Sequence, residues 1–149
     1  MSGDEERILI DRLGRLAWRW GRLFGNAGGG RLGARLAARL LPENIHEIDL
    51  VLALPPDDAL AMARLVLASL GEPVDDNRLA PDEYELRAVL GSGALNVNPA
   101  VVTLRLVATS WASTRIRVRG VAKEGLIPQR AGRQAAERVA AALRASVQR

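Results

Sequence analysis

The stretch that decides the fold is VVTLRLVATSWASTRIRVRGVA, residues 101–122, in which two alternating runs flank a short polar turn. Apolar or small side chains occupy the even-numbered positions of both runs, which is the period of a half-buried β-strand. Cross-strand partners share one face of a sheet, so even positions pair with even positions, for example Leu106 with Ile116. The turn around Trp111 then has an odd number of residues, which is typical of a turn combined with a bulge. The sequence therefore predicts a β-hairpin with one face in the core.

The odd-numbered face of this hairpin is rich in arginine. Its four arginines are Arg105, Arg115, Arg117 and Arg119. The predicted register places Arg105 opposite Arg117, and like charges in that position cost up to about 1 kcal/mol per pair. We expect a solvated outer face on which Glu83 and Glu85 of the preceding strand relieve the repulsion. The alternative is a sheet surface that binds phosphates or acidic partners.

The composition excludes several classes of functional site. The 149 residues are enough for one domain with a sizeable core. The chain has no cysteine and a single histidine, His46, which excludes disulfides, zinc-thiolate sites, a thiol nucleophile and a multi-histidine metal site. The acids stand mainly at helix starts, in turns and on the outer strand face rather than in one cleft. We therefore predict no catalytic residue, no metal and no cofactor, and a cytoplasmic location.

Positive charge is concentrated at the N-terminus. Residues 1–41 hold eight arginines against four acids, whereas the remaining residues hold 13 basic and 13 acidic side chains. Residues 8–24 read as an amphipathic helix with an apolar stripe at spacings of four, three, four and three: Leu9, Leu13, Leu16, Trp20 and Leu23. Four arginines form a basic stripe beside it: Arg12, Arg15, Arg19 and Arg22. The same segment holds three large aromatic residues, Trp18, Trp20 and Phe24. Gly14 and Gly21 each cost about 1 kcal/mol relative to alanine, so this helix needs a partner surface.

Three kinds of partner fit the N-terminal helix. An apolar stripe with spacings that alternate between four and three residues is typical of a helix that packs against the protein's own core, a second copy of the chain or another protein. A basic amphipathic helix with tryptophan is also typical of contact with an anionic membrane surface. Arginine with interleaved tryptophan is also compatible with binding to nucleic acid, although the chain matches no known nucleic-acid-binding module. The acidic start and recurring arginines are unlike a secretory signal or a membrane span, so any membrane contact is peripheral.

We divide the chain into a basic helical arm, residues 1–44, with a glycine-rich joint at 25–33, and a single domain, residues 45–149. The domain reads as a strand at 47–54, a helix from Asp57 as N-cap to 70, strands from 83 onward and a helix at about 128–147. Residues 72–82 form at most a short edge strand near Val74 and Leu79. These elements predict an α+β two-layer sandwich, β-α-β-β-β-α, in which a mainly antiparallel sheet of four to five strands carries two helices on one face.

This order of elements resembles the general layout of helix-grip and TATA-binding-protein-like folds. The resemblance implies that the domain binds apolar ligands, nucleic acid or other proteins, and it carries no motif that would transfer a functional residue. We favour a non-catalytic binding or assembly module whose arm contacts a partner protein or an anionic membrane. The first alternative is a carrier of small apolar ligands, with a pocket between the sheet and the last helix near Tyr84 and Asn96. The second is a nucleic-acid-binding protein.

Overall fold

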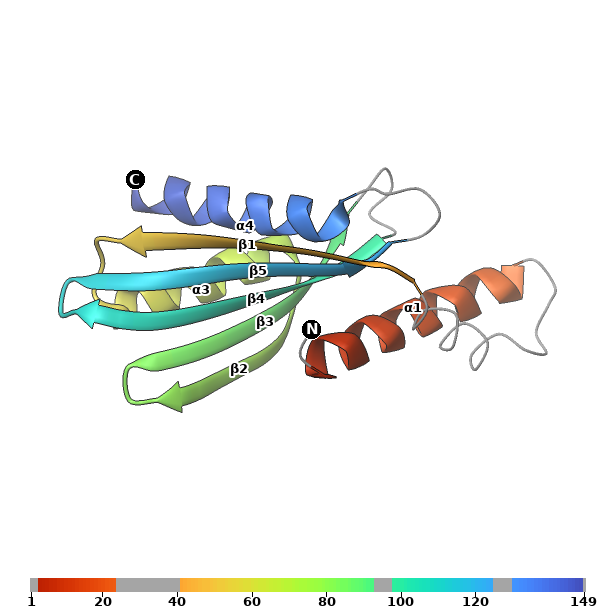
Figure 1. The fold of residues 1–149 in the computed structure, drawn as a ribbon, viewed down its shortest axis with the longest axis horizontal. Helices are drawn as coiled ribbons and strands as arrows, with labels where there is room; N and C mark the ends of the chain where they lie inside the picture. The colour runs from red at the N-terminus through yellow and green to blue at the C-terminus, as the bar shows by residue number, and fades with distance from the viewer. Residues whose placement is uncertain (1–2, 24–40, 93–97, 125–129, 149) are drawn as a thin grey trace.

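The computed structural model describes residues 3–23, 41–92, 98–124 and 130–148, and the side chains of residues 16–23 and 92 are outside the description (Figure 1). The elements in chain order are α1 (Gly3–Leu23), β1 (Glu43–Leu52), α3 (Pro56–Leu70), β2 (Glu72–Ala80), β3 (Glu83–Ser92), β4 (Asn98–Ser110), β5 (Ser113–Lys123) and α4 (Ala131–Val147).

The five strands form one antiparallel sheet in the order β1-β5-β4-β3-β2. The predicted hairpin is confirmed, because Leu106 pairs with Ile116, Arg105 pairs with Arg117, and the register shifts between Ala108 and Ser110 as a bulge requires. The predicted fold class is also confirmed: the chain is α+β, with α3 and α4 packed on the even-numbered face (Figure 1). The polar segment 72–80 forms a full edge strand, β2, so four strands rather than three follow α3.

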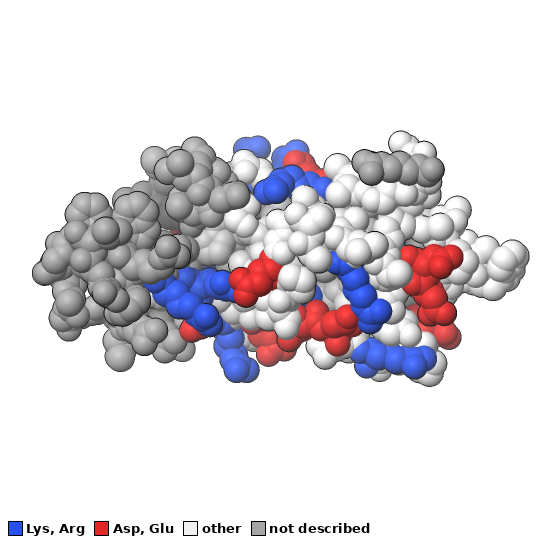
Figure 2. Space-filling view, turned by 180° about the vertical axis from the view of Figure 1, so that it is seen from behind, with Lys and Arg blue, Asp and Glu red and all other residues white. Residues whose placement is uncertain are grey.

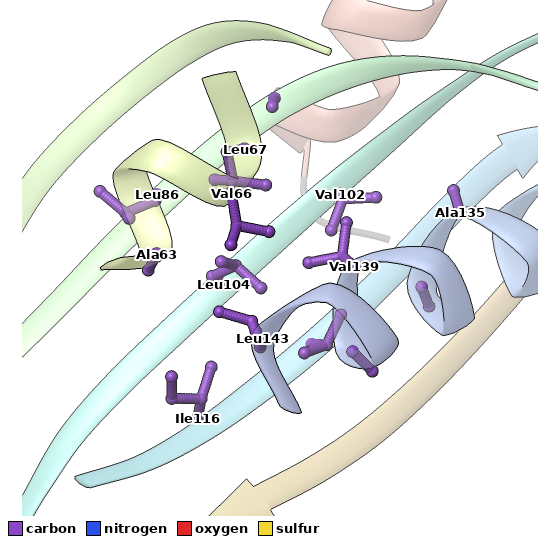
Figure 3. Packing of buried hydrophobic residues seen from close by; sticks show 14 of the residues in the cluster. Ala63, Val66, Leu67, Leu86, Val102, Leu104, Ile116, Ala135, Val139 and Leu143 are labelled. Atoms are coloured by element: carbon purple, nitrogen blue, oxygen red, sulfur yellow. The ribbon is translucent and has the colours of Figure 1, made fainter. Parts of the chain in front are cut away.

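The core lies between the even-numbered face of the sheet and the two helices (Figure 3). Leu104 and Ile116 project from the two central strands toward Leu143 of α4, and all three side chains are 0% exposed. Leu67 of α3 covers the other half of the sheet and is 2% exposed. Because side chains from both helices and four strands meet here, the layer between sheet and helices is filled.

Helix α4 approaches the sheet closely at its N-terminal end. Gly132 of α4 lies over Gly120 of β5, and a Cβ atom at either position would collide with backbone oxygen of Gly132 or Asn44. Asn44 of β1 also accepts a hydrogen bond from the backbone N–H of Arg133, at 3.0 Å, through its side-chain oxygen. These two glycines therefore set the distance between the helix and strands β1 and β5.

The start of α3 differs from the sequence prediction. Asp57 is not the N-cap, since Pro55 occupies that position and no side chain caps the helix by a hydrogen bond. Pro56 is the first helical residue, where the fixed φ of proline suits the helix and its missing N–H is not needed. Asp57 and Asp58 lie in the first turn, where the macrodipole favours negative charge. Among the residues that the structure describes, no helix is long and apolar enough to cross a membrane.

Candidate functional site

The first turns of α1 lie on the odd-numbered, outer face of the sheet. Leu9 is 0% exposed and packs with Val101 of β4 and Val121 of β5 in a small apolar cluster separate from the main core. Ile8 and Val89 pack against the edge of the same cluster. Of the surfaces that the sequence left open for this helix, its first half thus uses the protein's own sheet.

Acids in the first turn of α1 meet cations of the sheet. Glu5 is 2% exposed and accepts a hydrogen bond from the hydroxyl of Thr103 at 2.9 Å, and the Nε of Arg119 lies 3.4 Å from its carboxylate. Asp4 and Glu6 extend the contact to two further cations at longer range: Arg87 at 3.5 Å and Lys123 at 3.7 Å, respectively. The negative end of the arm is therefore bound to the protein's own outer face.

The predicted basic stripe begins where this contact ends. Arg12 lies 2.5 Å from a carboxylate oxygen of Glu72 in β2, and Arg15 pairs with Asp11 one turn earlier, with an Nε to oxygen distance of 2.8 Å. Trp18, Arg19, Trp20 and Arg22 belong to the helical backbone of α1, but their side chains lie outside the described residues, as does all of Phe24. The role of these five residues stays a prediction.

Three of the four sheet arginines are paired with acids. Arg105 pairs with Glu83, as predicted, and that hydrogen bond raises the pKa of Arg105. The hydrogen bond to Asp49 of β1, at 3.0 Å, likewise raises the pKa of Arg117. Arg119 pairs with Glu47 and with Glu5. This arrangement favours a neutralised outer face over an anion-binding one.

The remaining sheet arginine, Arg115, is exposed and stands between Val51 of β1 and Val107 of β4 in the same cross-strand row. Within the described ranges it has no acidic partner. The other predicted counterweight, Glu85, is the cross-strand partner of Arg105 and its charge favours the charged form of that arginine, while its carboxylate also contacts Arg87 on its own strand at 2.5 Å. Arg115 is thus the one arginine of this face for which the described residues supply no acidic partner, and the anion-binding alternative stays untested.

The predicted ligand pocket is only partly described. Tyr84 is half-buried at the edge of the main core, with the guanidinium of Arg78 over its ring at 5.6 Å from the centroid. Asn96 lies outside the described residues. The neighbouring layer between sheet and α4 is occupied by side chains that are 0% exposed, among them Val139 and Leu143. An apolar ligand near Tyr84 would have to displace part of this packing.

A hollow of about 740 Å³ lies between α1 and the β2 edge of the sheet. Its lining residues are Asp4, Arg7, Ile8, Ile10, Asp11, Val74, Asp75, Asn77 and Arg87. Arg87 is the most buried charged side chain there, at 10% exposure, and contacts Asp4, Asp75 and Glu85. Sequence reasoning missed this hollow because it exists only when α1 lies on the sheet. Among the described residues no group of three metal-ligating side chains occurs.

Charges of both signs are mixed on the face of the molecule opposite to that of Figure 1. Figure 2 shows basic and acidic residues side by side on the face seen there, without a broad area of either sign. Arg64 and Asp76, which pair at 2.7 Å, exemplify this mixing, because α3 supplies the cation and β2 the acid. The excess positive charge of the chain is therefore not gathered on the folded face seen in that view.

Comparison with known proteins shows likeness of structure only. No family model matches the chain, and no curated protein matches it. A START superfamily protein from Mycobacterium smegmatis is 12% identical, with a TM-score of 0.40, over 70% of this chain and 97% of that one. Norcoclaurine synthase from Thalictrum flavum, in complex with dopamine and hydroxybenzaldehyde, is 16% identical with a TM-score of 0.42, covering 76% and 91%. An aromatase/cyclase from Streptomyces is 14% identical with a TM-score of 0.39, covering 72% and 93%. Values this low carry no argument about family or function.

Proposed function

We propose that the protein is a non-catalytic binding module whose N-terminal helix contacts an anionic membrane surface. The observation that supports this is the division of charge along α1. Its acids all lie within the first eleven residues, and three of them contact sheet cations. From position 12 to the end of the helix the sequence holds four arginines and no acid. Arg12 and Arg15 pair with Glu72 and Asp11, so the part of the helix that stays cationic in the sequence is the end that carries Arg19 and Arg22.

The apolar stripe favours a membrane over nucleic acid. A helix that binds phosphates needs arginine, but it gains nothing from leucine repeated along one face. The stripe of α1 continues from Leu9 through positions 13, 16, 20 and 23, and tryptophan stands among the arginines. Apolar residues on one face, arginine beside them and tryptophan at the boundary are typical of an interfacial helix. The alternative partner of α1 is a protein with an apolar, acidic groove. The experiment below distinguishes this protein partner from a membrane.

A small-ligand carrier is the less favoured function. The layer between the sheet and α4 is filled, and Gly120 and Gly132 bring the backbones of β5 and α4 together without space for a ligand. A carrier of this form would have to move α4 away from the sheet before a ligand could enter.

The test uses the full chain, because a truncation that removes α1 would uncover the apolar side chains of Val101 and Val121. The protein is sedimented with phosphatidylcholine vesicles that contain or lack phosphatidylserine. An arginine near an anionic surface contributes about 1 kcal/mol, so Arg19→Gln combined with Arg22→Gln should weaken binding by about 30-fold. The matched control is Arg115→Gln combined with Arg144→Gln, which removes the same charge from exposed positions away from α1 and should bind as the parent does.

A second readout locates the contact. The chain has three tryptophans, so Trp111→Phe leaves only Trp18 and Trp20 as reporters. Their emission should shift to shorter wavelength with phosphatidylserine vesicles and return with added salt, which screens the attraction. If the protein does not sediment with these vesicles, or if both double variants weaken binding equally, the membrane proposal is wrong. If the protein is monomeric, does not bind vesicles and binds an acidic protein, the result would support the protein partner instead of the membrane.

A further inference from the structure

Leu9, the first residue of the apolar stripe of α1, faces the protein's own sheet. Leu9 is buried against Val101 and Val121, and positions 13, 16, 20 and 23 follow it on the same line of the helix. Figure 1 shows that α1 runs on past the end of the sheet. A bilayer that took up the whole stripe would have to approach from the side on which the sheet lies. Docking on the sheet and lying on a bilayer therefore compete for one face of one helix.

We infer that the docked position of α1 is the membrane-free state, and that the helix must leave the sheet before its whole stripe binds an anionic bilayer. This inference rests on the proposed function and adds its regulation. The sheet acts as an internal competitor for the helix. Any change that weakens docking should therefore strengthen membrane binding.

The sheet is built to tolerate release of the helix. Each cation that α1 contacts has a second acid on the sheet itself. The pairs that remain after release are Arg87 with Glu85 and Asp75, Arg119 with Glu47, and Lys123 with Glu43. No cation of this set would be left without a carboxylate. Among the described residues of the sheet, the apolar cluster that contacts α1 consists of Val101 and Val121, with Val89 packed against them.

The docked state is held in part by Thr103. Its hydroxyl is the neutral donor to the buried carboxylate of Glu5, at 2.9 Å. A hydrogen bond to a charged group is worth enough to change an equilibrium by about tenfold or more. Thr103→Val keeps the shape of the side chain and removes this donor. It also leaves the sequence of α1 unchanged, so the affinity of the free helix for lipid stays the same.

A single side chain reports whether the helix is docked. Lys123 is the only lysine of the chain, its side chain is 2% exposed, and it contacts Glu43 at 2.9 Å and Glu6 at 3.7 Å. Release of α1 removes the contact between Lys123 and Glu6. An amine-acylating reagent should then modify Lys123 faster, and mass spectrometry of the peptide that contains it measures the rate.

The experiment compares the parent chain, Thr103→Val and Thr109→Val with phosphatidylserine-containing vesicles and without them. Thr109 is the matched control, since its hydroxyl bonds to Ser113 at the far hairpin turn, 3.0 Å away. We expect vesicles to accelerate acylation of Lys123 in the parent. We expect Thr103→Val to bind vesicles about tenfold more tightly and to be acylated faster without them, whereas Thr109→Val should behave as the parent.

Three results would refute this inference, and the third would also refute the proposed function. If the parent binds vesicles but acylation of Lys123 does not change, α1 binds while docked, so the competition is refuted and the membrane proposal stands. The same holds if Thr103→Val binds no more tightly than the parent. If neither the parent nor Thr103→Val binds vesicles, both proposals fail.

Discussion

Substitution of Gly132 by alanine tests the close contact between α4 and the sheet. Alanine favours a helix interior over glycine by about 1 kcal/mol, so Gly132→Ala would stabilise the protein if only helix propensity mattered. The structure predicts the opposite sign. The added Cβ would meet the backbone oxygen of Asn44 well inside contact distance and would lie 3.0 Å from the backbone oxygen of Gly120.

The size of the effect follows from what has to move. Both obstructing atoms are backbone oxygens of the central sheet and its β1 edge, which cannot rotate away as a side chain does. Helix α4 must shift, and overpacking of this kind costs about 1–3 kcal/mol. We expect a net destabilisation of about 2 kcal/mol, which corresponds to a decrease in Tm of about 6 °C for a domain of this size.

Thermal and urea unfolding followed by circular dichroism measure this change. The control is Ala141→Gly on the exposed side of the same helix, which should destabilise by about 1 kcal/mol through helix propensity alone. If Gly132→Ala is as stable as the parent or more stable, α4 does not lie as close to β1 and β5 as described, and the packing argument is wrong.

Three further predictions concern the core, one ion pair and the hairpin turn. Leu143→Ala, at a 0% exposed position, should destabilise by about 2–5 kcal/mol in urea unfolding, whereas Leu65→Ala, at 72% exposure, should change stability by less than about 0.5 kcal/mol; equal effects would contradict the assigned core. The hydrogen bond from Arg133 lowers the pKa of Glu137, so the pair stabilises the fold above the ordinary glutamate pKa and loses this effect as the pH falls through the lowered value. The stability difference between the parent and Glu137→Gln should therefore be present at neutral pH and decrease as the pH falls below the ordinary glutamate pKa, and a difference that does not depend on pH would refute the pairing. Trp111→Ala should leave Tm unchanged within experimental error, because the side chain is 87% exposed; a clear loss would show that Trp111 is buried against something in solution.

The sequence predicts the hairpin because alternation fixes which positions share a face. A slip by one residue would turn Leu104 and Ile116 out of the core, so the even positions had to pair with one another. The position of β1 could not be obtained in this way. Periodicity identifies the strand but not its neighbour, and only the observed order places Asp49 beside Arg117. The acids that neutralise the outer face were therefore only partly foreseen.

Edge strand β2 was underestimated for a related reason. Its residues are almost all exposed, so they show neither an apolar period nor a buried side chain that would mark a strand. Asp76 is one of the polar residues that made the segment read as a loop, and it pairs with Arg64 of α3. Backbone pairing with β3 holds this strand, and backbone pairing leaves no mark on side-chain pattern.

The docking of α1 was the least predictable feature of the candidate site. The macrodipole at the start of a helix favours Asp4, Glu5 and Glu6, and this local effect is enough to explain why acidic residues stand there in the sequence. Their contacts join positions as distant as Glu5 and Arg119, which are 114 residues apart. A local pattern carries no information about such a pair. The division of the chain at residue 44 likewise stays a prediction.

The place of β1 in the sheet has a consequence for the order in which the protein folds. Strands β2 to β5 follow one another along the chain and pair with their sequence neighbours, so each closes only a short loop. β1 pairs with β5 instead, and the contact between Glu43 and Lys123 spans 80 residues. Closing the larger loop costs more chain entropy before any contact repays it. The four-strand meander should therefore form first in refolding, and β1 should join it in a later step.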